Sequence, residues 1–376
     1  MMEIYPSGPL RGTLQVASDK SISHRAVIFG SLATGTTRIQ NLLEGEDVLC
    51  TIAILRELGV SIEKKGSAWV VKGCRGIFQA PSKILYCGYS GTTLRLLTGL
   101  LSGQSFTSLL TGDPSLNRRP MGRVIEPLTQ MGASIHEEHR GEKRIVVVEG
   151  RKLKKGMFQI PVASAQLKTA LLLAGLASSE PVSVREPFKS RDHTERMLKA
   201  FGARIQVKRV QVNLKPGGKL KGQKVRVPAD FSSAAFFLVA ALINPDPRTK
   251  IVLKSVGVNP TRTGALEVLK KMGARIQIVN RRTICGEPVA DLVARPSKLK
   301  GTTISGALIP RLIDEIPILS VAAALAHGKT VIKDAAELRV KETDRIRSIV
   351  TELSKFGVSV KERPDGLEIN GVSGKQ

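Results

Sequence analysis

The sequence predicts a mixed α/β fold made of repeated units, each ending in a helix, a glycine and a β-hairpin. The 376 residues are 42% apolar and 24% charged, a globular composition that is long enough for two domains. A pattern of apolar residue, glycine, small residue, any residue and Ile or Val occurs five times. Its glycines are 70 to 84 residues apart, so the repeats account for almost the whole chain.

The five copies of the pattern share one local organisation. They lie at residues 58–62, 131–135, 201–205, 272–276 and 356–360. A helical spacing of apolar residues leads into each glycine, as at 124–131, and glycine suits the left-handed backbone that ends many helices. Strands follow, as at 276–279, and a second strand comes after a turn, as at 145–148.

The first polar motif, at residues 18–25, opens a predicted helix over 22–32. Asp19 or Ser21 can cap this helix, and the N–H groups of its first turn favour an anion. Lys20 lies at the helix entrance and Arg25 about one turn inside. The motif therefore predicts either an anion site or a capped surface helix with two solvated cations.

Two further motifs predict backbone or arginine contacts to anions. The Gly-rich turn at 88–93 opens an apolar helix, and its small residues let an anion approach the backbone closely. In the segment 117–123, Pro120 is expected at the first position of a helix, with Arg119 beside it to clamp a carboxylate or phosphate. An ordinary Gly-rich turn and a basic turn are the alternatives.

Two helix starts and a boundary follow. The segment 164–168 opens an apolar helix over 169–176, and 190–196 opens another, with Asp192 or Thr194 as its cap. His193 in this second start is a general base or a structural residue. The basic stretch 208–226 alternates with apolar residues and reads as strand and turn surface. The segment 227–233 is the best domain boundary, since Pro228 ends a strand and Asp230 or Ser232 can cap the next helix.

The last unit brings carboxylates and cations together. Asp314 and Glu315 precede Pro317 and an apolar helix. Lys341 and Arg345 are four residues apart, which predicts one helical face, with Glu342 three residues before Arg345. These residues predict either surface ion pairs or a buried carboxylate among cations that transfers a proton.

The formal net charge of +26 has three candidate causes: nucleic acid, a small polyanionic substrate, or a Lys-rich proteome. Nucleic acid is disfavoured because aromatic residues are 4% of the chain and none are interleaved with basic runs. No apolar run reaches the roughly 18 residues of a membrane helix. The four cysteines are scattered, so neither a disulfide framework nor a zinc site is expected, and a cytoplasmic location fits.

These motifs resemble those of the EPSP synthase (3-phosphoshikimate 1-carboxyvinyltransferase) family from about Leu10 to Ile369. The motifs at 19–25 and 339–345 are highly specific for that family. Four further motifs resemble its glyphosate-tolerant class, at residues 119–123, 164–166, 191–195 and 259–262.

The resemblance implies a fold. It is a two-domain inside-out α/β barrel, the enolpyruvyl transferase fold, built from βαβαββ repeats with substrates bound between the domains. The first domain would comprise residues 1–19 and 229–376, and the second residues 20–228 with three repeats. Five of the expected six repeats are present, so the first domain is expected to be incomplete at its C-terminus. A monomer is expected.

The resemblance also implies a reaction. The family transfers the enolpyruvyl group of phosphoenolpyruvate (PEP) to the 5-hydroxyl of shikimate 3-phosphate and releases phosphate, in the biosynthesis of chorismate and aromatic amino acids. The partners are these two small molecules, with no cofactor, metal, nucleic acid or membrane.

The family's functional residues match positions of this sequence. Shikimate 3-phosphate would be held by Lys20, Ser21, Arg25, Ser164, Ala165, Gln166, Arg191, Asp314 and Lys341. PEP would be held by Lys20, Gly91, Thr92, Arg119, Gln166 and Arg345. The catalytic residues would be Asp314, which accepts the hydroxyl proton, and Glu342 and Lys20, which transfer protons at the PEP carbon.

The sequence departs from the family pattern in three places. Ala17-Ser18 replaces Pro-Gly, and Tyr89 replaces Asn in the Gly-rich turn. The chain ends at Gln376, before an Asp-His-Arg-Ile-Ala-Met motif and a later basic residue that contact PEP in the family. A truncated, weakly active or inactive copy, with PEP binding most affected, is therefore one alternative, and a basic nucleic-acid-binding protein is another. The related UDP-N-acetylglucosamine carboxyvinyltransferase is disfavoured because it lacks the motif at 19–25.

Overall fold

The computed structural model describes residues 8–141 and 143–371 and divides the chain into two compact units. Unit 1 comprises residues 1–17, 228–283 and 288–376, and unit 2 comprises residues 18–227 and 284–287. Residues 1–7 and 372–376, which the sequence assigned to the first domain, lie outside the described part.

The unit boundaries differ from the sequence-based ones at two places. Ser18 and Asp19 fall in unit 2, because the Asp19 carboxylate accepts a hydrogen bond from the Ile22 amide at 2.7 Å and so belongs to the helix it caps. Residues 284–287 also fall in unit 2, where Glu287 lies 2.8 Å from His193. Pro228 begins the second segment of unit 1, one residue earlier than expected.

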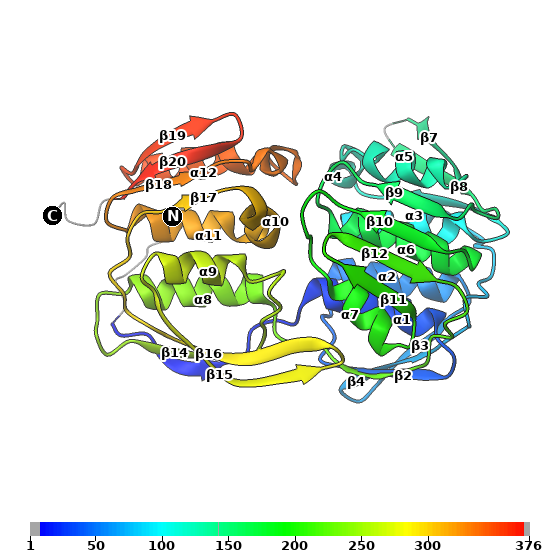
Figure 1. Ribbon diagram of the computed structural model, residues 1–376, viewed down its shortest axis with the longest axis horizontal. Coiled ribbons are helices and arrows are strands. Elements are labelled where there is room, and N and C mark those ends of the chain that lie inside the picture. Colours follow the sequence, from blue (N-terminus) through cyan, green and yellow to red (C-terminus); the bar gives the residue numbers. More distant parts are fainter. Residues whose placement is uncertain (1–7, 142, 372–376) are drawn as a thin grey trace. The chain divides into compact units, whose positions relative to one another are not determined.

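Unit 2 contains three four-stranded sheets (Figure 1). The sheet β13-β2-β4-β3 is formed by Lys224–Arg226, Thr36–Gln40, Ala68–Lys72 and Ser61–Lys65. The sheet β5-β6-β8-β7 is formed by Leu85–Tyr86, Thr107–Thr111, Lys143–Glu149 and Ser134–Arg140. The sheet β11-β12-β10-β9 is formed by Arg204–Lys208, Gln211–Lys215, Val182–Arg185 and Gly156–Gln159.

The helices of unit 2 are of two kinds. They are α1 Lys20–Leu32, α2 Glu46–Glu57, α3 Gly91–Ser102, α4 Pro114–Asn117, α5 Gly122–Gln130, α6 Ala165–Ser178 and α7 His193–Ala200. Helices α1, α3 and α6 are buried along most of their length. Helices α5 and α7 instead have one apolar and one polar face. Each repeat therefore supplies one core helix and one covering helix.

Unit 1 contains two four-stranded sheets in its described residues. The sheet β1-β14-β16-β15 is formed by Arg11–Leu14, Lys250–Gly257, Glu287–Arg295 and Arg275–Ile284. The sheet β17-β18-β20-β19 is formed by Thr303–Ile304, Lys329–Ile332, Gly366–Asn370 and Ser359–Arg363. The helices are α8 Phe231–Ile243, α9 Gly264–Lys271, α10 Ile309–Leu312, α11 Ile316–Ala324 and α12 Arg345–Lys355, with 3-10 helices at Gly306–Leu308, Ile313–Glu315 and Ala336–Val340.

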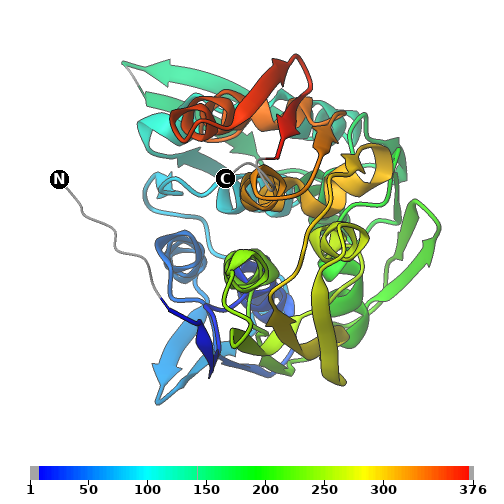
Figure 2. The same ribbon diagram turned by 90° about the vertical axis from the view of Figure 1, so that its left-hand side faces the viewer.

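Helices lie inside and sheets outside in this architecture. In unit 1, the apolar helices α8 and α11 lie between the two sheets (Figures 1 and 2). Every sheet joins a parallel pair of strands to an antiparallel hairpin, as in β5, β6, β8 and β7. The predicted inside-out arrangement of helices and sheets is confirmed. Within the described residues, no helix is long and apolar enough to span a membrane.

The recurring glycines end helices as predicted. Gly59, Gly132, Gly202, Gly273 and Gly357 all have positive φ, between 73° and 96°. They follow helices α2, α5, α7, α9 and α12, and each precedes the outer strand of a hairpin. Each of these junctions needs a residue in the left-handed conformation. The glycines therefore recur along the sequence because the backbone needs positive φ at each junction.

One predicted helix start is wrong. Pro120 does not occupy the first turn of a helix, because α5 begins at Gly122 with Met121 as its N-cap. The Arg144 guanidinium donates to the carbonyls of Leu116 and Arg119, at 3.0 and 2.7 Å. These bonds hold the preceding residues in a turn, which delays the helix.

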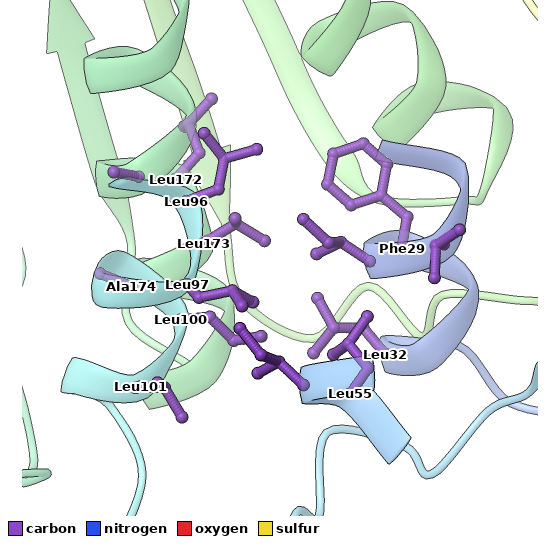
Figure 3. Packing of buried hydrophobic residues seen from close by; sticks show 14 of the residues in the cluster. Phe29, Leu32, Leu55, Leu96, Leu97, Leu100, Leu101, Leu172, Leu173 and Ala174 are labelled. Carbon is purple, nitrogen blue, oxygen red and sulfur yellow. The ribbon is translucent and has the colours of Figure 1, made fainter. Parts of the chain in front are cut away.

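The core of unit 2 is centred on α3 and α6. Leucines of these two helices face each other and meet Phe29, Leu32 and Leu55 from α1 and α2 (Figure 3). The two helices touch through backbone at Gly99, where an added Cβ would lie 2.2 Å from the carbonyl oxygen of Ala170. Only glycine fits there without moving one helix.

We expect Gly99→Ala to destabilise the protein by about 1–3 kcal/mol, because the methyl group would push α3 away from α6. The measurement is urea unfolding followed by circular dichroism. Gly122→Ala is the matched control, since the nearest atom to its added Cβ is a flexible Glu126 oxygen at 3.4 Å. Equal stability of the two variants would show that the α3–α6 contact tolerates a side chain.

Candidate active site

The N-terminus of α1 presents Lys20 and Ser21, as the sequence predicted. Asp19 is the N-cap, and Ser23 also bonds to its carbonyl oxygen at 2.8 Å. The Lys20 ammonium lies 2.8 Å from a carboxylate oxygen of Asp47, while the Lys20 side chain stays half exposed. The capped helix end thus holds a lysine that is oriented by a carboxylate yet open to solvent.

Arg25 is buried one turn further along α1. Its guanidinium donates to the Thr194 hydroxyl at 2.7 Å, the Thr169 hydroxyl at 2.9 Å and the Ser21 carbonyl at 3.0 Å. Burial lowers the pKa of Arg25 to about 10, while Glu195 raises it and the nearby charge of Arg191 lowers it. Arg25 therefore stays charged at neutral pH with only uncharged hydrogen-bond acceptors among the described residues.

The Gly-rich turn brings two arginines to the start of α3. Ser90 caps this helix by accepting from the Thr93 amide at 3.1 Å. At Gly91, an added Cβ would lie 3.0 Å from a terminal nitrogen of Arg119 and 3.5 Å from one of Arg95. Glycine thus lets two guanidinium groups approach the backbone, which suits an anion. Tyr89, which departs from the family pattern, is 45% exposed.

The start of α6 joins this cluster through Gln166. Ser164 caps α6 by accepting from the Leu167 amide, and the Ala165 carbonyl accepts from the Thr169 hydroxyl. The Gln166 side chain accepts from Arg95 at 2.6 Å and donates to the Thr92 hydroxyl at 2.9 Å. The side-chain amide of Gln166 therefore links the N-terminus of α6 to that of α3, and both Gln166 and its partner Thr92 are predicted site residues.

In unit 1, Asp314 lies among cations. Its carboxylate is 3.3 Å from Arg345 and 4.0 Å from Lys341, and Arg345 lies 2.6 Å from Glu342. The predicted single helical face is wrong, because α12 begins at Arg345 behind the N-cap Asp344. Lys341 lies in extended backbone after a 3-10 helix, and it reaches Asp314 from there.

Glu315, next to Asp314, has a different environment. Its side chain is fully buried and lies 2.7 Å from Arg262. It also contacts the Ser232 hydroxyl. Asp314 is only partly buried, with 29% of its side chain exposed. The two adjacent carboxylates therefore divide into a structural one and one that a ligand can reach.

The structure brings the predicted residues together within each unit. In unit 2, Gly91, Thr92, Arg119 and Gln166 form one group, and Ser21 and Arg25 are joined with Arg191 nearby. In unit 1, Asp314, Lys341, Glu342 and Arg345 form another. His193 is buried against Glu287, which favours its structural interpretation.

The sequence analysis gave no site role to several residues that organise these groups, although Thr194 was a candidate cap and Arg262 lay in a motif that resembles the family. The residues are Asp47, Arg95, Thr169, Thr194 and Arg262. Arg95 had a signal, because it is the one charged residue in the first turns of an otherwise apolar helix. Asp47 lies 27 residues from Lys20, and nothing local predicts that pairing.

Comparisons with known proteins agree on one family. A family model described as EPSP synthase (3-phosphoshikimate 1-carboxyvinyltransferase) matches residues 4–376. The 3-phosphoshikimate 1-carboxyvinyltransferase of Syntrophomonas wolfei is 52% identical over 365 residues, covering 96% of this chain and 85% of the relative. That of Desulforamulus reducens is 53% identical over 371 residues, covering 98% and 86%.

Solved structures agree with this result. The EPSP synthase from Acinetobacter baumannii is 45% identical, with a TM-score of 0.85, and the match covers 97% of this chain and 82% of that one. The enolpyruvyl transferase NikO from Streptomyces tendae has a TM-score of 0.75 at 17% identity, which supports the fold alone. The chain therefore belongs to the EPSP synthase family.

Proposed function

We propose that this chain transfers the enolpyruvyl group of phosphoenolpyruvate to the 5-hydroxyl of shikimate 3-phosphate and releases phosphate. The family membership supports this reaction. The observation that carries it is the buried guanidinium of Arg25, whose partners are two hydroxyls and a carbonyl. A buried cation without a bonded carboxylate is suited to an anionic ligand, and both substrates carry a phosphate and a carboxylate.

The cations and small residues of unit 2 would hold most of the two substrates. For shikimate 3-phosphate we propose Lys20, Ser21, Arg25, Ser164, Ala165, Gln166 and Arg191, with Asp314 and Lys341 from unit 1. For PEP we propose Lys20, Gly91, Thr92, Arg119 and Gln166, with Arg345 from unit 1. Arg95 and Arg119 at Gly91 offer bidentate donors of the kind that bind phosphate or carboxylate oxygens.

The chemistry needs one proton acceptor and one proton donor. Asp314 would accept the proton of the 5-hydroxyl while the hydroxyl oxygen forms a bond to C2 of PEP. Glu342 and Lys20 would supply a proton to the PEP methylene carbon, which gives a tetrahedral intermediate. Glu342 and Lys20 would take a proton back from the resulting methyl group while the bond between C2 and the phosphate oxygen breaks, which releases phosphate and forms the enol ether. The donors at Gly91 would stabilise the charge that develops on the departing phosphate.

We also propose that the reaction takes place in the cytoplasm. Cys50, Cys74, Cys87 and Cys285 are all free. Burial raises the pKa of the Cys74 and Cys87 thiols, so both stay protonated at neutral pH. Unpaired thiols are typical of a reducing compartment.

The test of this function is phosphate release from the purified chain with both substrates present. We expect phosphate only when PEP and shikimate 3-phosphate are supplied together, and none when either is omitted. An enolpyruvyl product identified by mass spectrometry must accompany the phosphate. Release from PEP alone would indicate a phosphatase, and no release from the complete mixture would overturn the proposal.

We expect Lys20→Met to lower kcat/KM for both substrates by about ten- to a hundredfold, because a charge-assisted contact to each is lost. Steady-state kinetics with each substrate varied in turn would measure it. Lys64→Met is the matched control, since Lys64 forms an exposed ion pair with Glu44 at 2.7 Å. Unchanged kcat/KM in Lys20→Met would remove Lys20 from both sets.

We expect Asp314→Asn to lower kcat by about a hundredfold or more with small changes in KM, because the variant keeps its shape and loses its basicity. Glu315→Gln should instead lower the unfolding free energy by about 1.5–3 kcal/mol, because Arg262 loses the fully buried one of its two carboxylate partners and keeps only Asp230 at 3.2 Å. Kinetics and thermal unfolding of both variants separate these effects. If Glu315→Gln loses more turnover than Asp314→Asn at equal folding, the proton acceptor has been misassigned.

A further inference from the structure

Unit 2 contains a fully buried lysine that the proposed mechanism does not use. The Lys168 ammonium, on α6, lies 2.8 Å from Glu186 and 2.7 Å from Glu195, and none of these three side chains is more than 4% exposed. Burial lowers the pKa of Lys168, but the two carboxylates together raise it above its usual value. Burying three charged groups this deeply costs desolvation energy, so the cluster is weak evidence for stability and suggests a role other than core packing.

The cluster has more negative than positive charge. Two carboxylates face one ammonium. Glu195 lies 2.7 Å from Lys168, and burial raises the pKa of the Glu195 carboxyl although Lys168 lowers it. Glu186 is better satisfied, since it also accepts from the Ser190 amide at 3.0 Å. Among the charged groups that act on Arg25, Glu195 is the strongest in raising its pKa. When both carboxylates are ionised, the cluster carries an excess negative charge that favours the charged form of Arg25.

The same cluster fixes the groups that hold Arg25. Lys168 pairs with Glu195. The residues adjacent to them in the sequence, Thr169 and Thr194, have hydroxyl oxygens that lie 2.6 Å from each other. Arg25 donates to both of these hydroxyls. Helices α6 and α7 are thus joined by two adjacent contacts, one ionic and one between hydroxyls, and the hydroxyl pair receives the guanidinium.

We infer that Lys168, Glu186 and Glu195 are positioning residues for Arg25, which they hold charged and oriented for an anionic group of shikimate 3-phosphate. The inference rests on the proposed function, because that function assigns Arg25 to this substrate. Three of the five guanidinium N–H groups of Arg25 are used within the protein, and two remain for the ligand. Because the PEP residues at Gly91 are tied by Gln166 rather than by Lys168, the effect is specific to one substrate.

The variant Glu195→Gln tests the inference. It removes the excess charge and leaves Lys168 paired with Glu186, so the fold keeps a balanced ion pair. We expect the Kd for shikimate 3-phosphate, measured by calorimetric titration, to rise about tenfold, while KM for PEP changes by less than about twofold. Asp291→Asn in unit 1 is the matched control, because Asp291 is 4% exposed and lies 2.9 Å from Lys254; it should leave the Kd for shikimate 3-phosphate unchanged.

A double-mutant cycle separates positioning from general loss of stability. If Glu195 acts through Arg25, adding Glu195→Gln to an Arg25→Gln variant should change the Kd for shikimate 3-phosphate by less than about twofold. Full additivity of the two changes would overturn the inference. Should Glu195→Gln not fold, Glu186→Gln replaces it in the same cycle, with the same expected results.

The outcomes also separate this inference from the proposed function. A parent protein that binds no shikimate 3-phosphate overturns both. A parent that binds it and releases phosphate from both substrates, together with an unchanged Kd in the folded Glu195→Gln or Glu186→Gln variant, overturns the positioning role alone. A loss of shikimate 3-phosphate affinity matched by an equal rise of KM for PEP would also overturn it.

Discussion

The burial of helices that are apolar on nearly every side is the constraint on which this structure depends. Helices α1, α3 and α6 cannot face water, so the sheets of unit 2 must lie outside them, and the charged residues of these helices lie in their first two turns. Lys20, Gly91 and Ala165 are the first residues of the three helices. Helix N-termini attract anions through their unpaired N–H groups, so the packing of the core also places the candidate anion-binding groups.

The charged residues at the starts of the core helices have opposite signs in the two units. In unit 2, Lys20 and the arginines around Gly91 lie at the helix starts, and these cations add to the positive ends of the helix dipoles. In unit 1, Asp230 caps α8, and Asp314 lies in the turn before α11. Carboxylates near helix N-termini interact favourably with the positive ends of the helix dipoles. One repeated scaffold thus carries the proposed anion-binding groups in one unit and the proposed proton acceptor in the other.

Sequence reasoning found features that depend on local backbone and missed those that depend on distant partners. The five junction glycines were predictable because a helix-to-strand reversal requires positive φ, and Asp19 was predictable because capping spans three residues. The start of α5 was mispredicted because Arg144, more than twenty residues away, donates to the carbonyls of Leu116 and Arg119 and holds the residues before Pro120 in a turn. Lys168 gave a usable signal as a lone cation at the start of an apolar run, yet the sequence does not say that its partners are carboxylates.

The chemistry of the partners, rather than the net charge, distinguishes the functional cations. Of the described lysines and arginines, four are buried: Arg25, Arg144, Lys168 and Arg262. Lys168 and Arg262 contact carboxylates, and Arg144 holds two backbone carbonyls and Glu137, so their charges are balanced or used within the fold. Arg25 alone of the four is hydrogen-bonded only to uncharged oxygens, with N–H groups to spare. The charge of Glu195 acts on it without a hydrogen bond, so an anionic ligand would supply a direct counter-charge. Most of the lysines and arginines are not buried, so the proposed site is indicated by the partners of one buried cation and not by the net charge of +26.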